Sequence, residues 1–503
     1  MKKTVLLSFV FLLFSTAVTI RFVRPVVAEE TIYIRPDGTV EGTDKIQRDG
    51  NVYTFTDNIF NQSIIVERDN IVVDGAGYTL QGTGAISWPS RVGMTLHRRS
   101  NVTVKNIEIK VFFNGIVFDN CSNNIIYGSR ITNNILGIDL SGSDNIISGN
   151  NLTNNNDSIS LSGSDNIISG NKITANNRYS IWLLDSSDNI VSGNNLTNNN
   201  LGIWLDDSSS NRIQGNKIGG NDSIGIKLSD SSGNSISGNN LTTNSLCMFL
   251  QDSAGNIISG NTMTKSGRGV FLFSGFHPTF NNKFYHNNFI SNNEHVSFSP
   301  ILDNSWDNGF EGNYWSDYDG TDLNQDGIGD TPYIINTDNQ DNYPLMGRYY
   351  DFPISNIVGH ELEETFHMSI ICNSTVTDSG VLSPIINLET GEWEGGLYIL
   401  EVTGSEGTKG FCRFTIPKNL LNSGQGSWTV YVNGTKVTSS CNIWDNSTHT
   451  FIYVPYNHST LEITIFGWWI VPEFPTWTSI LLIIIVLAVA LAIYKRARLF
   501  WLS

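Results

Sequence analysis

The strongest local chemistry in the sequence lies between positions 322 and 330. Oxygen-bearing side chains occupy the first, third, fifth and ninth places of this stretch: Asp322, Asn324, Asp326 and Asp330. A glycine in sixth place and the backbone carbonyl of Ile328 in seventh match the first part of a calcium-binding loop. The twelfth place holds Tyr333 instead of a bidentate Glu. We therefore expect a stand-alone loop that binds structural calcium, with an Asp/Asn-rich turn as the alternative.

A second group of carboxylates recurs once per sequence repeat, at Asp185, Asp207, Asp230 and Asp252. Two carboxylates ~5 to 9 Å apart can cleave a glycosidic bond, and their mutual repulsion raises the pKa of one. The candidate catalytic residues are Asp185, Asp206, Asp207 and Lys227. An Asp-Ser-Ser turn gives the same spacing without catalysis. Sugar cleavage is thus an alternative to binding, and not the main expectation.

Three histidines near the end of the repeats raise the question of copper, because imidazole suits that metal. They are His277, His286 and His295, with Glu294 beside the last. They do not share one position in the repeat, as convergent ligands would. We expect solvated histidines and no copper site.

These residues are placed by a six-residue phrase that recurs from 145 to 261. It reads NIISGN at 145, 166 and 256, NIVSGN at 189, NRIQGN at 211 and NSISGN at 234, and weaker copies start at 70, 101, 124 and 282. A period of 21 to 23 residues indicates solenoid turns that stack on one another. Three short strands per repeat predict an all-β, parallel β-helix of about ten coils. Asparagine suits the corners, because it tolerates left-handed backbone and its amide can bridge adjacent coils.

Alternation along the third strand of each repeat separates inward from outward side chains. The inward columns are Ile138, Ile159, Ile181, Ile203, Ile226 and Met248, and, two residues later, Leu140, Leu161, Leu183, Leu205, Leu228 and Leu250. Between them, an outward column carries the aromatic residues Trp182, Trp204, Phe249 and Phe271. Such side chains suit sugar rings, or a loop or domain that packs on them.

The chain divides into seven predicted segments. They are a signal peptide (1–28), the β-helix with an N-terminal cap (29–300), a closing segment with the calcium loop (301–350), an antiparallel β-sandwich (351–468), a linker (469–477), a transmembrane helix (478–494) and a basic cytoplasmic tail (495–503). The first segment has two lysines, an apolar run and small residues before 29, although an uncleaved anchor is an alternative. The later apolar span followed by Lys495, Arg496 and Arg498 predicts anchoring with the bulk of the chain outside.

Composition narrows the classes of partner. A net charge of -17 excludes a basic surface that binds nucleic acid. A chain of 503 residues is too long for a single compact core, so two or more structural units are expected. Five cysteines are too few for a disulfide scaffold. We expect Cys121 and Cys247 to be buried thiols and Cys412 to pair with Cys441. Twelve Asn-x-Ser/Thr sites are potential glycan acceptors on an exported chain.

The coils, followed by GNYWSDYDG, DGIGDTPYII and DNYPL, resemble the NosD-like right-handed parallel β-helix family of archaeal exported proteins. That family takes its name from a periplasmic protein linked to copper delivery, and the wider group includes sugar-binding and sugar-cleaving proteins. The VPEFP at 471–475 is similar to the PEF-type signal handled by a membrane transpeptidase. The resemblance implies a surface protein that recognises polysaccharide or glycoprotein glycans. A polysaccharide lyase or glycoside hydrolase, a structural surface-layer or adhesion protein, and a copper-handling protein are the alternatives.

Overall fold

The computed structural model describes residues 31–84, 92–300, 302–357, 360–377, 381–386, 393–422 and 428–468. These residues form two compact units that divide between Ser231 and Ser232, and each unit is described by itself. The predicted signal peptide, linker, transmembrane helix and basic tail lie outside the described residues. Within the described ranges, no helix is long and apolar enough to cross a membrane.

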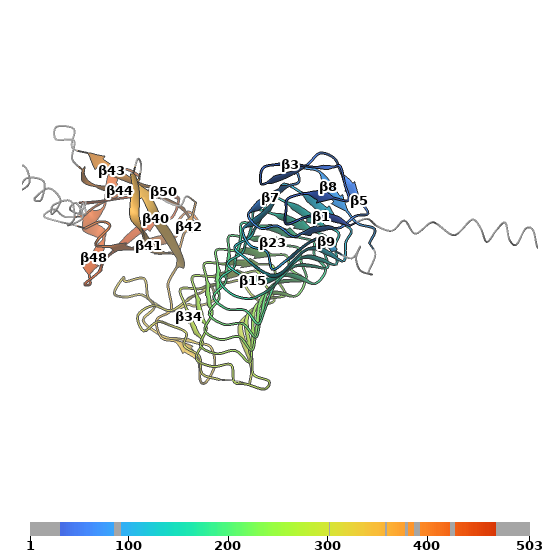
Figure 1. Cartoon of the computed structure of the whole chain (residues 1–503). Helices are drawn as coiled ribbons and strands as arrows, with labels where there is room; N and C mark the ends of the chain where they lie inside the picture. Colours follow the sequence, from blue (N-terminus) through green and yellow to red (C-terminus); the bar gives the residue numbers. More distant parts are fainter. Residues whose placement is uncertain are drawn as a thin grey trace, which may run out of the picture. The chain divides into compact units, whose positions relative to one another are not determined.

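The first unit is a parallel β-helix built from three sheets, each of which gains one strand per turn (Figure 1). The first sheet runs β2 (Val40–Glu41), β1 (Ile32–Ile34), β6 (Ile64–Val66), β9 (Val92–His97), β12 (Asn114–Ser122), β15 (Leu136–Ser143), β18 (Asp157–Ser162), β21 (Tyr179–Leu184), β24 (Leu201–Asp206) and β27 (Ile224–Ser229). The second runs β3 (Ile46–Asp49), β4 (Val52–Phe55), β7 (Ile71–Asp74), β10 (Val102–Lys105), β13 (Ile125–Tyr127), β16 (Ile146–Ser148), β19 (Ile167–Ser169), β22 (Ile190–Ser192) and β25 (Arg212–Gln214). The third runs β26 (Lys217–Gly219), β23 (Asn195–Thr197), β20 (Lys172–Thr174), β17 (Asn151–Thr153), β14 (Arg130–Thr132), β11 (Glu108–Lys110), β8 (Thr79–Gln81) and β5 (Ile59–Phe60).

The second unit begins with turns of the same kind. Their strands are β30 (Leu246–Gln251), β33 (Arg268–Phe273) and β36 (Glu294–Ser299), then β28 (Ser235–Ser237), β31 (Ile257–Ser259) and β34 (Lys283–Tyr285), and finally β29 (Asn240–Thr242), β32 (Thr262–Thr264), β35 (Asn288–Ile290) and β37 (Tyr314–Trp315). A short hairpin of β38 (Tyr333–Ile334) and β39 (Gln340–Asp341) follows.

Two antiparallel sheets complete the second unit. One runs β40 (Arg348–Ile357), β41 (His360–Cys372), β45 (Lys409–Pro417), β49 (His449–Asn457) and β48 (Asn442–Asp445). The other runs β42 (Thr375–Val376), β44 (Trp393–Thr403), β50 (Thr460–Trp468), β46 (Thr429–Val432) and β47 (Thr435–Lys436), with β43 (Val381–Ile386) beside β44 and the short 3-10 helix η1 (Thr438–Ser440) after β47. Ile370, Phe414 and Ile452 of one sheet share a buried core with Leu400 and Ile463 of the other. The predicted antiparallel arrangement is confirmed.

The described residues form about twelve solenoid turns, slightly more than the approximately ten predicted. The difference arises at the two ends of the repeat. Strand β1 already pairs in parallel with β6, so the first turn begins at Ile32 instead of near Asn70. After the recognisable repeats, β37 adds one more rung by pairing in parallel with β35.

The predicted inward columns are confirmed, because residues such as Ile181, Leu183, Ile203 and Leu205 are completely buried. Between the strands, buried asparagines form ladders along the corners. Asn145 Nδ2 donates to Asn166 Oδ1 at 3.0 Å, and the same bond recurs from Asn166 to Asn189. Each amide therefore satisfies polar groups that burial would otherwise leave unpaired.

Most ladder asparagines are not the residues with left-handed backbone. That conformation belongs to their neighbours, such as Asp144 with a φ of 59° and Gly149 with a φ of 63°. Both predicted roles of asparagine are confirmed, mostly on neighbouring residues: Asn133 and Asn154, each with a φ of 57°, turn the chain, and the Asn134 Nδ2 that follows donates to Asn155 Oδ1 in the interior. Asn101, with a φ of 54°, does both, since its Nδ2 donates to Asn70 Oδ1 at 2.9 Å.

The predicted pairing of Cys412 with Cys441 is also wrong. Cys372 on β41 and Cys412 on β45 are register partners in neighbouring antiparallel strands, with Cα atoms 4.3 Å apart, and they form the disulfide. Cys441 follows η1, and its thiol donates to the Val437 carbonyl. Cys121 and Cys247 are buried free thiols, as predicted.

Candidate functional site

The outward face of the first sheet in the first unit carries a pair of stacked tryptophans. Trp182 on β21 and Trp204 on β24 are register partners on successive turns. Their ring centroids lie 5.3 Å apart, and the planes differ by 13°. Both side chains are partly exposed, whereas the strand residues on either side of each are buried. The predicted outward orientation is confirmed, but the rings stack face to face along the solenoid instead of lying flat on its surface.

Tyr179 completes this cluster and was missed by the sequence reasoning. Its ring centroid lies 5.7 Å from that of Trp182 and 5.0 Å from that of Trp204. The guanidinium of Arg178 lies 4.3 Å above the Tyr179 ring. The sequence does mark this repeat as unusual, because the segment from Asn171 to Trp182 is one residue longer than the equivalent segment from Asn194 to Trp204.

Lys227 covers the end of the tryptophan pair. It follows Trp204 in register on β27, and its Nζ lies 4.5 Å from the centre of the Trp204 ring. Such a cation–π contact stabilises a half-buried ammonium, although burial lowers the pKa of Lys227. Trp204 Nε1 donates to Ser229 Oγ at 3.2 Å, which fixes the orientation of the indole.

The predicted catalytic carboxylates do not share one environment. Asp206 ends β24 and is partly buried, and this burial raises the pKa of its carboxyl, with smaller contributions from Asp207 and Asp230. Asp185 and Asp207 are exposed and have φ values of 48° and 46°. Their position in left-handed turns agrees with the alternative reading, in which these carboxylates recur because the turn requires them.

In the second unit, Phe249 and Phe271 form an equivalent stack, with centroids 5.2 Å apart and planes 19° apart. Phe273 lies against both rings. Nearby, Asp252 Oδ1 accepts bonds from the backbone N–H groups of Gly275, Phe276 and His277. Asp252 therefore holds a loop and is not available as a catalytic carboxylate.

The predicted calcium loop is a series of closed turns. Asp322 accepts bonds from the N–H groups of Asp326 at 3.0 Å and Gly327 at 2.9 Å, and Asp326 accepts from Ile328 at 2.9 Å. Gly327 has a φ of 82°, as a sharp turn requires. Both oxygens of Asp322 and Oδ1 of Asp326 thus accept bonds from backbone N–H groups of the loop itself, which is the pattern of the Asp/Asn-rich turn given as the alternative.

The remaining loop side chains are also bonded. Asn324 Nδ2 donates to Asp326 Oδ2, and Asp330 Oδ2 accepts from the Leu323 N–H, each at 2.9 Å. The hydroxyl of Tyr333, in twelfth place, donates to Asp317. In the described part of the chain, no group of three or more His, Cys, Asp or Glu residues is arranged to hold a metal ion.

The expectation of solvated histidines is wrong for two of the three. His286 Nε2 lies 2.7 Å from Glu311 Oε2, and His286 stacks on Tyr349 with centroids 4.0 Å apart. His295 is buried, with Nε2 3.2 Å from Asp317 Oδ1. His277 is exposed, as expected. The partners of these two histidines, Glu311, Tyr349 and Asp317, lie after the recognisable repeat, so the repeat pattern does not reveal the contacts.

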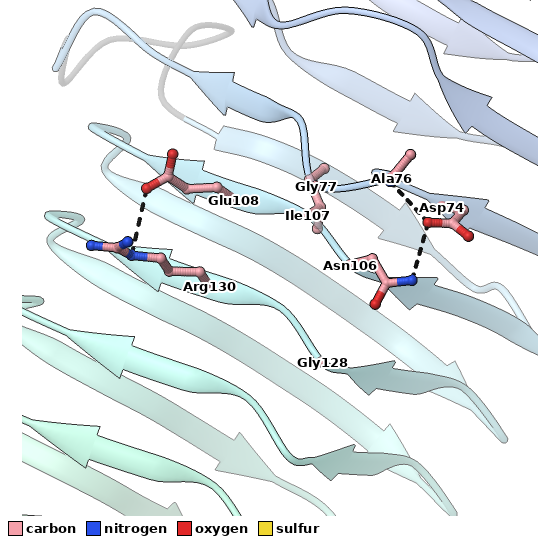
Figure 2. Close-up of a pocket in the computed structure, with 8 residues that line it drawn as sticks. All are labelled: Asp74, Ala76, Gly77, Asn106, Ile107, Glu108, Gly128 and Arg130. Atoms are coloured by element: carbon pink, nitrogen blue, oxygen red, sulfur yellow. Dashed lines mark hydrogen bonds and ion pairs between the residues drawn. The ribbon is translucent and has the colours of Figure 1, made fainter.

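A shallow hollow of about 640 Å³ lies on the early turns of the first unit (Figure 2). Its charged residues are already partnered: Asp74 accepts bonds from the Ala76 N–H and Asn106 Nδ2, and Arg130 lies 3.5 Å from Glu108. The hollow offers polar groups but neither an aromatic surface nor an unpaired charge among its lining residues.

Comparison with known proteins gives one family. A family model described as periplasmic copper-binding protein (NosD) matches residues 31–223 and 175–320, which together exceed half of the chain. No protein of curated function matches the chain.

Solved structures share the fold at low identity. The periplasmic alginate epimerase AlgG is 14% identical, with a TM-score of 0.44, over 55% of this chain and 82% of that one. The A-module of the Azotobacter vinelandii mannuronan C-5 epimerase AlgE4 is 14% identical, with a TM-score of 0.38, over 55% and 88%. A tailspike protein mutant of E. coli bacteriophage HK620 in complex with pentasaccharide is 9% identical, with a TM-score of 0.33, over 82% and 76%. These likenesses concern the fold alone, because function depends on the site.

Proposed function

We propose, for a chain that belongs to the family described as periplasmic copper-binding protein (NosD), that its β-helix recognises polysaccharide or glycoprotein glycans. The proposed binding surface is the outward face of the first sheet in the first unit, centred on Trp182, Trp204 and Tyr179. In the other unit, Phe249 and Phe271 form a second, separate candidate surface.

One observation carries this proposal. The stacked indoles of Trp182 and Trp204 are partly exposed on the outside of a strand ladder whose other columns already fill the interior. The fold does not need them for its core, and exposed aromatic clusters mark contact surfaces. The hydroxyl of Ser162 and the carboxylates of Asp157 and Asp206 lie on the same sheet and can bond sugar hydroxyls.

A sugar-cleaving or lyase activity is the second candidate. It is supported by Asp206 and Lys227, whose pKa values are shifted in opposite directions, each by burial beside the tryptophans. A carboxyl that keeps its proton and an amine that loses it more readily would be an acid and a base. Asp185 and Asp207 add no further support, because both serve as turn residues.

The family description and the sequence also support a proposal for the position of the protein in the cell. We infer an exported chain, since the family is described as periplasmic. Archaeal surface attachment through the VPEFP motif, processing by a transpeptidase and anchoring by residues 478–494 belong to the same proposal. Copper handling and a purely structural surface role are its competitors. Metal analysis of protein purified without added copper tests the first of these.

Glycan binding is tested by affinity electrophoresis of the wild type and of the double variant Trp182→Ala/Trp204→Ala on a series of polysaccharides. Product analysis on the same polysaccharides separates binding from cleavage, because a binding module releases neither reducing ends nor unsaturated sugars. Unchanged mobility shifts in the double variant would contradict the proposal.

A further inference from the structure

The two ends of the Trp182–Trp204 stack differ. The outer face of Trp204 is covered by the ammonium of Lys227, 4.5 Å from the ring centre. On the preceding turn, the register partner of Trp182 is Ser160. A serine side chain is too short to cover an indole. The face of the Trp182 ring that points away from Trp204 therefore has only the small side chain of Ser160 beside it on the preceding turn.

Tyr179 does not take that place. Among the described residues, the ring contacts of Trp182 are with Tyr179 and Trp204. Although Tyr179 shares strand β21 with Trp182, its centroid lies closer to Trp204, at 5.0 Å against 5.7 Å. Tyr179 consequently leans toward the covered end of the stack and flanks the two indoles instead of lying over the Ser160 side.

The dimensions suit one more ring. Neighbouring turns of the solenoid are ~4.8 Å apart, and each turn of the stack holds one flat ring. On the turn that carries Ser160, which we call the Ser160 rung, no aromatic side chain occupies the outward position of the column. Polar groups surround this rung: Ser162 is exposed, and Asp157 lies 3.6 Å from Arg178 NH1 and accepts a bond from the Tyr179 N–H.

We propose that a pyranose ring binds on Trp182 above Ser160, as the next member of the stack. This inference rests on the proposed glycan recognition and gives it a position. The C–H face of the sugar packs on the indole, and its hydroxyls bond Ser162, Asp157 and Arg178.

The charges select an uncharged pyranose over a uronic acid. Asp139 and Asp157 lie on the preceding turns, and Asp185 closes the turn after β21. Arg178 already pairs with Asp157. A sugar carboxylate would meet carboxylates at this rung, and like charges in contact are repelled.

The test is a variant in which an aromatic side chain occupies the proposed sugar position. Ser160→Phe places an aromatic ring against Trp182, and the column tolerates phenylalanine, since Phe249 and Phe271 occupy it in the other unit. Ser160→Ala is the matched control. The full chain is titrated calorimetrically with a cello-oligosaccharide, a manno-oligosaccharide and an oligomannuronate.

We expect at least one neutral oligosaccharide to bind, Ser160→Phe to weaken it by about tenfold or more, and Ser160→Ala to leave it unchanged. Ser160→Leu fills the same rung with a smaller apolar side chain and should also weaken binding, so the inference is tested even if Ser160→Phe does not fold. Wild-type affinity in Ser160→Phe, together with loss in Trp182→Ala, would place the sugar elsewhere on the face and overturn this inference alone. Tighter binding of oligomannuronate would overturn the uncharged class. Absence of binding by all three probes would count against the proposed function itself.

Discussion

The indole N–H of Trp315 donates to Asp341 Oδ2 at 2.9 Å, at the end of one asparagine ladder. Asn287 Nδ2 donates to Asn313 Oδ1 at 2.9 Å, and the Asn313 N–H donates to the same Asp341 oxygen at 2.7 Å. The neighbouring ladder ends in the same way, with Trp306 Nε1 donating to Asn339 Oδ1. The Trp, Asn and Asp residues of the closing segment thus terminate the ladders of the solenoid.

Asp341 should make stability depend on pH. Burial raises the pKa of its carboxyl to about 7, above the unfolded value of about 3.9. The folded state therefore binds the proton more tightly, so this contribution is fully present below about pH 4 and is lost as the pH rises through about 7. Denaturant titrations across this window should show the free energy of unfolding falling with pH. Asp341→Asn keeps an oxygen acceptor and should flatten that trend, whereas an unchanged slope in this variant would contradict the assignment.

Arg413 should be among the most sensitive residues of the second unit. Its guanidinium is buried and pairs with Glu311, whose pKa is held at about 2, against burial, by Arg413 and His286. Because Arg413→Ala leaves the largely buried Glu311 carboxylate with His286 as its remaining ion-pair partner, we expect a loss of about 3 kcal/mol in the free energy of unfolding, at the low end for breaking a buried pair.

The matched control for Arg413→Ala is the double variant Glu311→Gln/Arg413→Met, which removes both charges and should recover much of the loss. A single variant as stable as the wild type would show that the pair is not structurally important.

Since the pKa of Glu311 is lowered on folding, the contribution of its carboxylate to the free energy of unfolding is present above about pH 4.5 and declines as the pH falls toward 2.

Much of the solenoid could be predicted because its period repeats the same physical requirement at every turn. Ile203 and Leu205 are buried for the reason that applies to Ile181 and Leu183, so the repeat alone gives the facing direction of Trp204. The Cys372–Cys412 bond could not be predicted in this way. It depends on β41 lying beside β45 in an antiparallel sheet, and local sequence does not determine that order.

The same limit applies to the candidate site. Trp182 and Trp204 follow from the register, but their face-to-face stacking and the Lys227 contact depend on side-chain rotamers. His286 was expected in solvent because its partner Glu311 lies 25 residues away, after the repeat has ended. Contacts that join repeating to non-repeating chain leave no periodic signal.

Calcium should stabilise the loop at 322–330. The side chains of Asp322 and Asp326 are already oriented by backbone N–H groups, and Arg413 donates to the Asp326 carbonyl, so an ion bound there would stabilise the second unit. At a free concentration of a hundred times Kd, the gain is about 2.7 kcal/mol. We expect a lower melting temperature after treatment with a chelator, recovery on adding calcium, and no response in Asp326→Ala. A melting temperature that ignores the chelator would argue against the ion.

The aromatic face should separate binding from folding. Trp182→Ala/Trp204→Ala removes two partly exposed rings from the outside of the first sheet while Ile181, Leu183, Ile203 and Leu205 still fill the interior. We expect a loss of glycan affinity of about tenfold or more, since each aromatic contact contributes about 0.5–1.5 kcal/mol beyond its buried area. The melting temperature should fall by only a few degrees, because the stacked pair is worth a similar amount to stability. Phe249→Ala/Phe271→Ala is the control in the other unit: it removes an equivalent stack, so a comparable fall in stability with retained binding would locate recognition at the tryptophans. Equal loss of binding in both double variants would contradict recognition at the tryptophans alone.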